Sequence, residues 1–385
     1  MSVISPPLSL YLHFPWCVEK CPYCDFNSHP ARQPPDQRAY VDALLADLEH
    51  DLPLVAERPV QTVFMGGGTP SLFDPDEIAR LMRGLAERLP LAADLEVTLE
   101  ANPGTVEAGR FAGYREAGVN RLSIGVQSLD AAKLQALGRI HGPAEAIAAA
   151  HAARAAGFDT YNLDLMFGLP QQGVAQALDD LAHAIDLAPP HLSWYQLTLE
   201  PNTRFAHNPP PLPDDDLLWD MQEAGQRLLA AVGFEQYEIS AYARPGHRCR
   251  HNLNYWSFGD YLGIGAGAHG KLTLADGRIL RRSKQRHPQA YLAAAGSAAG
   301  SAGERWLGAE DLPVEFMLNA LRLNAGVTAE LYARHTGASL ADIGPQLAQA
   351  RARGLLEPDP ARLAPTELGR RFLNDLLAVF EVDDG

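Results

Sequence analysis

Short apolar runs and helical patterns alternate along the first half of this 385-residue chain, and the alternation restricts the folds that it can adopt. Runs rich in β-branched and aromatic residues, typical of buried strands, occupy residues 8–14, 60–65, 95–100, 121–126, 160–166 and 192–199. Helical patterns separate them, and Pro143, for example, is placed to begin an alanine-rich helix. This order predicts an α/β fold of parallel βα units, either an open sheet or a partial (β/α)6 barrel. We favour the barrel, because polar residues gather where strands run into loops, the active-site face of such barrels.

The last part of the chain has a different pattern. Residues 293–303 are all alanine, glycine or serine, which favours a linker between a core at 1–292 and a C-terminal domain at 304–385. Helical patterns at 314–323, 328–336 and 340–353 precede a hairpin at 355–363 and a last helix that begins at Thr366. One stripe of that last helix holds Leu368, Phe372, Leu376 and Val379. The order predicts a mostly helical, winged-helix-like domain, which binds nucleic acid or covers a neighbouring domain.

Charge and composition favour the covering role. The chain has 47 acidic and 32 basic residues, a formal net charge of −15, so nucleic acid is not expected as a partner. With 46% hydrophobic and 21% charged residues it is typical of a globular protein. No uncharged apolar run reaches the roughly 18 residues of a membrane span, and residues 1–7 do not resemble an export signal. We therefore expect a cytoplasmic protein without a membrane span.

Three of the four cysteines follow the first predicted strand in a CxxxCxxC spacing, at Cys17, Cys21 and Cys24. Such close spacing argues against a disulfide framework and favours a metal or cluster site in a reducing compartment. Three thiolates can bind three irons of a [4Fe-4S] cluster and leave one iron open to a small molecule. The alternative is a zinc site with His13 or His29 as the fourth ligand.

The second predicted strand runs into Gly66, Gly67 and Gly68, followed by Thr69 and Pro70. Missing side chains allow the backbone to approach a ligand closely. Together with the cysteine triplet, this GGGTP segment resembles the radical S-adenosylmethionine (SAM) superfamily. The resemblance implies a partial barrel in which the cysteines hold a [4Fe-4S] cluster, the open iron binds the amino and carboxylate groups of SAM, and the glycine segment supports that amino group.

Further stretches resemble the oxygen-independent coproporphyrinogen III oxidase-like branch, and within it the bacterial heme chaperone subgroup. They read YLHFPWCVEKCPYCDFN, GGGTPS, EANPGT, NRLSIGVQS, LGRIH, NLDLMFGLP and HNLNYW. The resemblance implies that SAM is surrounded by Tyr11, Gly67, Gly68, Thr69 and Glu100. By the same resemblance, Gln127, Arg139 and Asp164 match residues that bind a second cofactor molecule in the oxidase. Whether this protein also binds a second SAM molecule is left open.

Two functions fit this resemblance. An oxidase uses the cluster and SAM to make a radical that removes hydrogen from coproporphyrinogen III, and oxidative decarboxylation to protoporphyrinogen IX follows. A heme chaperone binds heme and passes it to acceptor proteins, membrane-bound respiratory enzymes among them. The oxidases carry a fourth cysteine after the triplet and a long N-terminal extension before it. In this chain Phe26 occupies the fourth-cysteine position, and the first cysteine of the triplet is already residue 17. We favour the chaperone and expect no coproporphyrinogen oxidase activity.

The segment HRCRHNLNYW at residues 247–256 resembles the HNxxYW signature of the chaperone subgroup. His251 is the candidate for heme, because an imidazole can bind heme iron axially while nearby aromatic rings pack on the porphyrin. Arg248 or Arg250 could pair with the propionates. The structural alternative is that these residues only complete a loop and a core. Cys249 is either a thiolate ligand or a buried apolar residue, and we favour the latter.

Overall fold

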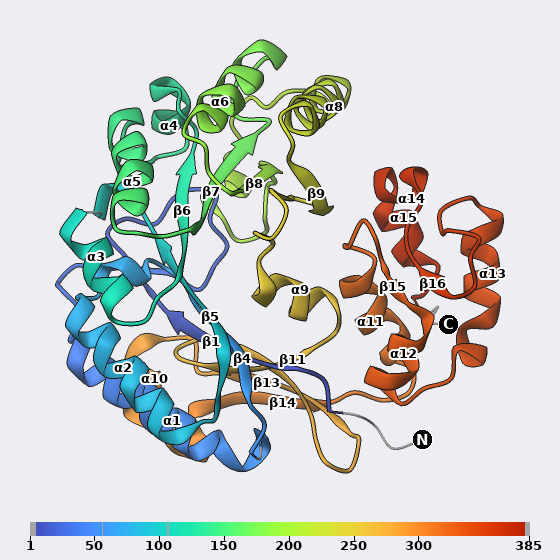
Figure 1. Ribbon diagram of the computed structural model, residues 1–385, viewed down its shortest axis with the longest axis horizontal. Helices are drawn as coiled ribbons and strands as arrows, with labels where there is room; N and C mark the ends of the chain where they lie inside the picture. The colour runs from blue at the N-terminus through green and yellow to red at the C-terminus, as the bar shows by residue number, and fades with distance from the viewer. Residues whose placement is uncertain (1–4, 56, 106–107, 382–385) are drawn as a thin grey trace.

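Twelve strands form one sheet that curls into an incomplete ring (Figure 1). The computed structural model describes residues 5–55, 57–105 and 108–381. The six predicted strands are confirmed, and they lie side by side in chain order, all parallel. Their bounds are Leu8–Phe14 (β1), Val60–Gly67 (β4), Leu91–Ala101 (β5), Arg121–Gln127 (β6), Thr160–Phe167 (β7) and His191–Gln196 (β8).

Both edges of this parallel core are extended by later strands. On the β1 side, β11 pairs in parallel and is followed by three antiparallel strands, whereas β10 and β9 continue antiparallel beyond β8. These strands are Glu235–Glu238 (β9), Ala241–Ala243 (β10), Asp260–Ile264 (β11), His269–Thr273 (β12), Ile279–Lys284 (β13) and Ser301–Trp306 (β14). In the described chain the edge strands β14 and β9 do not pair with each other, so the barrel is partial.

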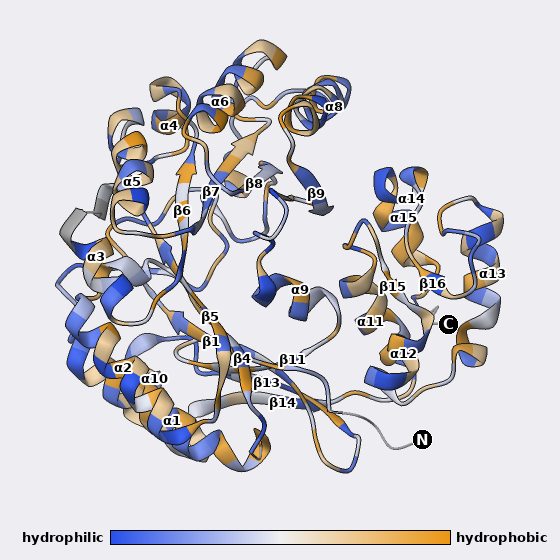
Figure 2. Cartoon of the chain, viewed as in Figure 1, coloured by the Kyte–Doolittle hydropathy of each residue, from blue (hydrophilic) through white to orange (hydrophobic). Residues whose placement is uncertain are grey.

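Helices cover the outside of the curled sheet (Figure 1). Neighbouring helices pack side by side, α1 on α2, α2 on α3, α3 on α5, and α6 on α8. The helices of the barrel region are Gln37–Val55 (α1), Pro75–Arg88 (α2), Ala108–Glu116 (α3), Ala131–Ala136 (α4), Pro143–Ala155 (α5), Val174–Asp186 (α6), Arg204–His207 (α7), Asp215–Ala231 (α8), Arg250–Trp256 (α9) and Pro288–Ala294 (α10). Figure 2 shows hydrophilic and hydrophobic residues alternating along these ribbons, as expected of helices with one apolar face.

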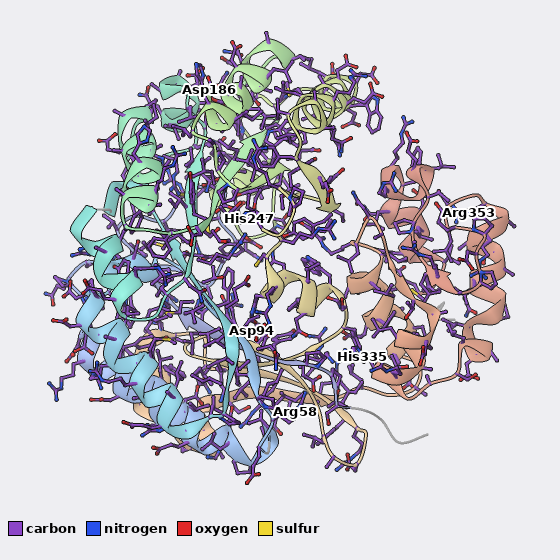
Figure 3. The ribbon with its side chains drawn as sticks, in the orientation of Figure 1. Arg58, Asp94, Asp186, His247, His335 and Arg353 are labelled. Atoms are coloured by element: carbon purple, nitrogen blue, oxygen red, sulfur yellow. The ribbon has the colours of Figure 1, made fainter. Side chains whose placement is uncertain are left out.

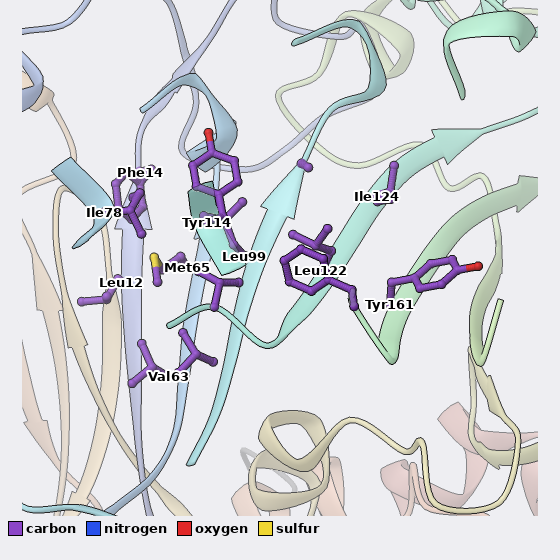
Figure 4. Close-up of a cluster of buried hydrophobic side chains, with 14 of the residues drawn as sticks. Leu12, Phe14, Val63, Met65, Ile78, Leu99, Tyr114, Leu122, Ile124 and Tyr161 are labelled. Atoms are coloured by element: carbon purple, nitrogen blue, oxygen red, sulfur yellow. The ribbon is translucent and has the colours of Figure 1, made fainter. Parts of the chain in front are cut away.

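The main hydrophobic core lies between the parallel strands and this helical layer. Successive side chains of a strand point to opposite faces, so Leu8, Leu10, Leu12 and Phe14 of β1 all pack outward against helices and are buried. Figure 4 shows the same pattern continuing on later strands, with Val63 and Met65, Leu99, Leu122 and Ile124 in one cluster.

The opposite face of each parallel strand turns polar residues into the barrel. Interior positions hold Ser9, Tyr11 and His13 on β1, Thr62 on β4, Glu96 and Glu100 on β5, Ser123 on β6, Asn162 and Asp164 on β7, and His191, Ser193 and Tyr195 on β8. Hydrogen bonds join them across strands, for example Thr62 to Ser9 and Ser123 to Asp164. The polar residues therefore line the interior along its length, rather than only the loop ends.

The C-terminal region is winged-helix-like, and its hydrophobic core also includes Phe258 and Ile279 of the preceding region. It contains α11 (Leu312–Ala320), β15 (Val327–Thr328), α12 (Ala329–Thr336), α13 (Gly344–Ala352), β16 (Arg362–Leu363), α14 (Glu367–Arg371) and α15 (Leu373–Ala378). β16 pairs with β15, and an isolated bridge joins Leu356 to Pro365 to complete the wing. The domain closes on the barrel, because Leu323 forms a bridge with Glu238 of the edge strand β9.

Two segments differ from their predicted form. Residues 293–303 contain the end of α10, the 3-10 turn Ala298–Gly300 (η3) and the start of β14. The start of β14 is a strand rather than a linker because its backbone pairs with β13. Alanine, glycine and serine all have the N–H and C=O groups that this pairing needs. The last helix breaks at Phe372, where φ is −116° and ψ is 51°. Leu376 is then buried while Phe372 stays half exposed. The division of the chain at residue 304 remains a prediction.

Short elements complete the described chain: β2 (Trp16–Cys17), β3 (His29–Pro30), and the 3-10 turns Pro70–Leu72 (η1), Pro103–Thr105 (η2) and Leu340–Ile343 (η4). None of the helices that the structure describes is both long and apolar enough to cross a membrane.

Candidate functional site

The three clustered cysteines lie in the loop between β1 and α1, at the carboxyl ends of the parallel strands. A short ladder between β2 and β3 ties the ends of this loop together. The thiols of Cys17, Cys21 and Cys24 are free and line one cavity of about 420 Å³. Burial raises the pKa of Cys17 and of Cys24, so without a metal both stay protonated at neutral pH.

Each sulfur has a polar neighbour within hydrogen-bonding range. Thr69 Oγ1 lies 3.5 Å from Cys17 Sγ, and Ser28 Oγ lies 3.8 Å from Cys24 Sγ. Arg139 Nη1 donates to Cys21 Sγ over 3.4 Å. Donors directed at sulfur are the outer-shell partners that iron–sulfur clusters use to tune their thiolates. The donor set therefore fits a [4Fe-4S] cluster.

The zinc alternative finds no support. His13 Nε2 is 2.8 Å from the Asn27 carbonyl and its Nδ1 is 3.1 Å from Tyr11 Oη, so both ring nitrogens are engaged. His29 packs against His287, with ring centroids 5.6 Å apart.

The glycine segment after β4 passes directly beneath the cysteine loop. The N–H of Gly68 donates to the Phe14 carbonyl at 2.6 Å, and that of Thr69 to the Trp16 carbonyl at 2.7 Å. A Cβ on Gly68 would lie only 2.5 Å from the Trp16 oxygen, and Gly67 has a φ of +110° that favours glycine. The segment can take this path only without side chains.

Two half-buried carboxylates, Glu100 and Asp164, face the same cavity. Glu100 Oε2 accepts the N–H of Gly67 at 3.1 Å. Burial raises the pKa of Glu100 to about 8, with a further upward contribution from the charge of Asp164. Burial also raises the pKa of Asp164, although Asn162 at 2.8 Å and Ser123 at 3.1 Å donate to it and oppose that effect. Such a pair suits a ligand that brings positive groups or hydroxyl donors.

Gln127 and Arg139 complete the wall of this cavity. Gln127 has a φ of +69° and accepts a hydrogen bond from Tyr195 Oη at 3.0 Å. Arg139 Nη2 donates to the Gly125 carbonyl at 2.8 Å, while its Nε is buried without a partner among the residues described. An unpaired buried donor at a cavity wall leaves capacity for a ligand.

A second cavity of about 490 Å³ adjoins the first inside the barrel. Tyr11 and His251 line it, and Phe26, Gly67 and Glu100 line both cavities. Phe26 is 58% exposed at the shared rim. The predicted cluster and SAM residues, Phe26 and His251 therefore lie in two adjoining cavities, with Tyr11 and His251 apart from the cysteines. Arg248 and Arg250, the candidate propionate partners, line neither cavity and pair with Glu235 and Asp94 instead.

His251 is the second residue of α9, which lies within the ring of strands (Figure 1). Its side chain is buried against Phe64, with ring centroids 4.9 Å apart. Its Nδ1 is 2.9 Å from Thr62 Oγ1, which donates its own hydrogen to Ser9. Nδ1 therefore carries the proton, and Nε2 keeps its lone pair. Burial lowers the pKa of His251 to about 3, so the ring is neutral.

The first turn of α9 is held by a residue that the sequence analysis missed. Glu96 accepts the N–H groups of Arg250 at 3.1 Å and His251 at 3.0 Å. It also accepts from Cys249 Sγ at 3.7 Å. Cys249 lines neither cavity, and burial raises its pKa to about 12. Asp94, which pairs with Arg250, lies beside α9 in Figure 3.

Comparisons with known proteins agree with this architecture. Residues 11–181 match the radical SAM superfamily model, and residues 307–372 match the HemN C-terminal domain. The solved structure of coproporphyrinogen III oxidase (HemN) from Escherichia coli, described as a radical SAM enzyme, superposes with a TM-score of 0.83. That alignment has 25% identity and covers 98% of this chain and 91% of the oxidase. The partial barrel, the cysteine loop and the glycine segment thus define a radical SAM protein. The cofactors of that family are a [4Fe-4S] cluster and SAM.

Relatives along the whole sequence narrow this class. The heme chaperone HemW of Escherichia coli is 54% identical over 375 residues, or 97% of this chain and 98% of the relative. HemW of Haemophilus influenzae is 49% identical over 383 residues, or 98% and 99% of the two chains. The chain belongs to the HemW family, and its function is of the HemW type.

Proposed function

We propose that this protein binds heme and delivers it to acceptor hemoproteins. One observation carries the proposal: the neutral imidazole of His251, fixed by Thr62, lines a cavity that also contains aromatic rings. A neutral imidazole with a free Nε2 is a ligand for heme iron, and aromatic rings pack well on a porphyrin. The names of the HemW relatives point in the same direction.

The adjoining cavity is assigned to the family cofactors. Cys17, Cys21 and Cys24 would hold the [4Fe-4S] cluster, with SAM against Gly67, Gly68, Thr69 and Glu100 and extending to Tyr11 in the second cavity. When bound and reduced, such a cluster would supply the electron for reductive cleavage of SAM. Gly67 would present backbone to the methionyl end, and the Glu100 carboxylate would pair with a positive group. Gln127, Arg139 and Asp164 would serve a second SAM molecule if one binds.

Coproporphyrinogen III oxidase activity is the second candidate, favoured by the superposition on HemN. The residue at the fourth-cysteine position weighs against it. Phe26 lies at the rim of both cavities and is 58% exposed, and its ring supplies neither a thiol nor a polar group. We therefore rank heme delivery above decarboxylation.

The acceptors we propose include membrane-bound respiratory enzymes, reached from the cytoplasm. A reducing compartment suits the free thiols of the cysteine loop. Nucleic acid is not a proposed partner, because α12 and α13 carry few basic residues in a chain of net charge −15.

Heme transfer tests the proposal. Protein with a reconstituted cluster is loaded with one equivalent of heme and mixed anaerobically with the apo-form of a b-type respiratory cytochrome. We expect the Soret band of the donor to be replaced by that of the cytochrome, and His251→Ala to reduce loading at least 10-fold. His151→Ala, an exposed residue of α5, is the matched control. Heme that loads equally well into His251→Ala would contradict the assignment.

A further inference from the structure

The second cavity continues past His251 to a histidine that the sequence analysis did not single out. His269 is the first residue of β12 and is exposed at this end of the cavity. Tyr255 and Tyr261 also line this cavity, with ring centroids 4.6 Å apart and hydroxyls 3.1 Å apart. The cavity thus has an imidazole from α9, an imidazole from β12 and an aromatic wall.

Only two of the histidines in this cavity have a free ring nitrogen in the described chain. Both nitrogens of His13 are engaged, by Tyr11 and by the Asn27 carbonyl. His251 uses Nδ1 alone, and neither ring nitrogen of His269 has a hydrogen-bond partner among the described residues. Burial lowers the pKa of His269, and the charges of Arg281 and Arg286 lower it further, which favours the neutral, metal-binding form.

This cavity also has an arginine side chain that forms no ion pair with the described residues. Arg286 lines the cavity, is exposed, and forms no ion pair with any carboxylate that the structure describes. The neighbouring Arg281 is already committed to Glu315 and to Tyr261 Oη. A free guanidinium can pair with a carboxylate in bidentate fashion. The cavity of about 490 Å³ lies within the roughly 300–1,000 Å³ of small-molecule sites.

We propose that His269 is the second axial ligand of the heme iron, with His251 as the first, and that Arg286 binds a heme propionate. This inference rests on the proposed heme function and extends it with a ligand and an anchor that the HNLNYW segment does not contain. One ligand is buried and the other is exposed. Loss of the exposed ligand, His269, therefore gives a route for handing heme to an acceptor without moving α9, whose His251 is buried.

Heme spectra of matched variants test the ligand. The cluster-reconstituted full chain is titrated anaerobically with ferric heme, and its Soret and electron paramagnetic resonance spectra are recorded. We expect a six-coordinate, low-spin iron in the parent protein and in His151→Ala. His269→Ala should give a five-coordinate, high-spin iron that added imidazole returns to low spin, and heme should dissociate about 10-fold faster.

Propionate recognition is tested separately with heme dimethyl ester. Arg286→Gln should bind heme several-fold more weakly than the parent but bind the dimethyl ester with unchanged affinity. Arg83→Gln, an exposed change on α2, is the control. A low-spin spectrum retained by His269→Ala, while His251→Ala loses heme, would overturn this inference and leave the proposed function in place. Failure of the parent protein to bind heme would overturn both.

Discussion

Glu96 of β5 accepts the backbone N–H of His251 at 3.0 Å, so a strand of the barrel fixes the first turn of the helix that carries the candidate heme ligand. The same carboxylate accepts the N–H of Arg250 at 3.1 Å. The imidazole of His251 is held by Thr62 of β4, whose Oγ1 lies 2.9 Å from Nδ1. The orientation of His251 therefore depends on two residues far from it in sequence.

Replacing Glu96 by alanine should destabilise the protein and weaken heme binding together. The change leaves two buried N–H groups without an acceptor, which costs about 1–3 kcal/mol of unfolding free energy. Urea unfolding followed by circular dichroism measures this loss, and heme titration measures the effect on binding. Glu87→Ala, an exposed change on α2, should alter neither. Normal heme affinity in a destabilised Glu96→Ala would show that Glu96 does not position His251.

Replacing Cys17, Cys21 and Cys24 together by alanine should abolish the iron–sulfur cluster. Thiolates are the expected protein ligands of the cluster iron, so the brown colour and the bound iron and sulfide should be lost after anaerobic reconstitution. Cys249→Ala should keep them, because Cys249 lies outside the cysteine loop and donates to Glu96. Full iron occupancy in the triple variant would refute the triplet assignment.

Glu100 should make stability depend on pH. Its ordinary pKa is 4.5 and burial raises the folded-state pKa to about 8, so the folded protein holds an extra proton between these values. The free energy of unfolding should then fall as pH rises from about 4.5 to about 8. Glu100→Gln should remove this slope, as measured by thermal unfolding without SAM from pH 5 to pH 9. Parallel pH profiles for the parent and the variant would rule this effect out.

Gly68→Ala should impair both folding and SAM binding. The new Cβ would meet the Trp16 oxygen at 2.5 Å and the Phe14 oxygen at 2.8 Å. Backbone atoms cannot move aside as a side chain can, so we expect a loss of about 1–3 kcal/mol and at least 10-fold weaker SAM binding by calorimetry. Gly344→Ala, with helical dihedrals and open space around it, should cost less than about 0.5 kcal/mol. Equal SAM affinity in Gly68→Ala and parent would contradict the role of this segment.

Local pattern was sufficient to predict much of the fold. The runs at 8–14 and 160–166 became β1 and β7 with nearly the predicted bounds, because an apolar residue at every second position gives each strand one face for the core. The helix at Pro143 begins as expected. Composition was misleading for β14, since its pairing with β13 depends on a strand about twenty residues earlier. The break at Phe372 likewise depends on packing that periodicity does not encode.

The roles of the site residues remain predictions, and the structure shows where these residues lie. The cysteines, Glu100, Asp164 and His251 do lie around two adjoining cavities. Glu96 and Thr62 were missed because their partners lie more than 150 residues away along the chain. One signal was present: a carboxylate at position 96 within a buried strand needs a partner, and the same alternation marks Glu100.

The most direct test of the central claim is a paired assay on the anaerobically reconstituted protein. One sample receives ferric heme, and the other receives coproporphyrinogen III with SAM and a reductant. The heme function predicts a stable Soret band that is lost in His251→Ala, and no protoporphyrinogen IX by chromatography. Protoporphyrinogen IX formed over many turnovers, with no heme band, would contradict it.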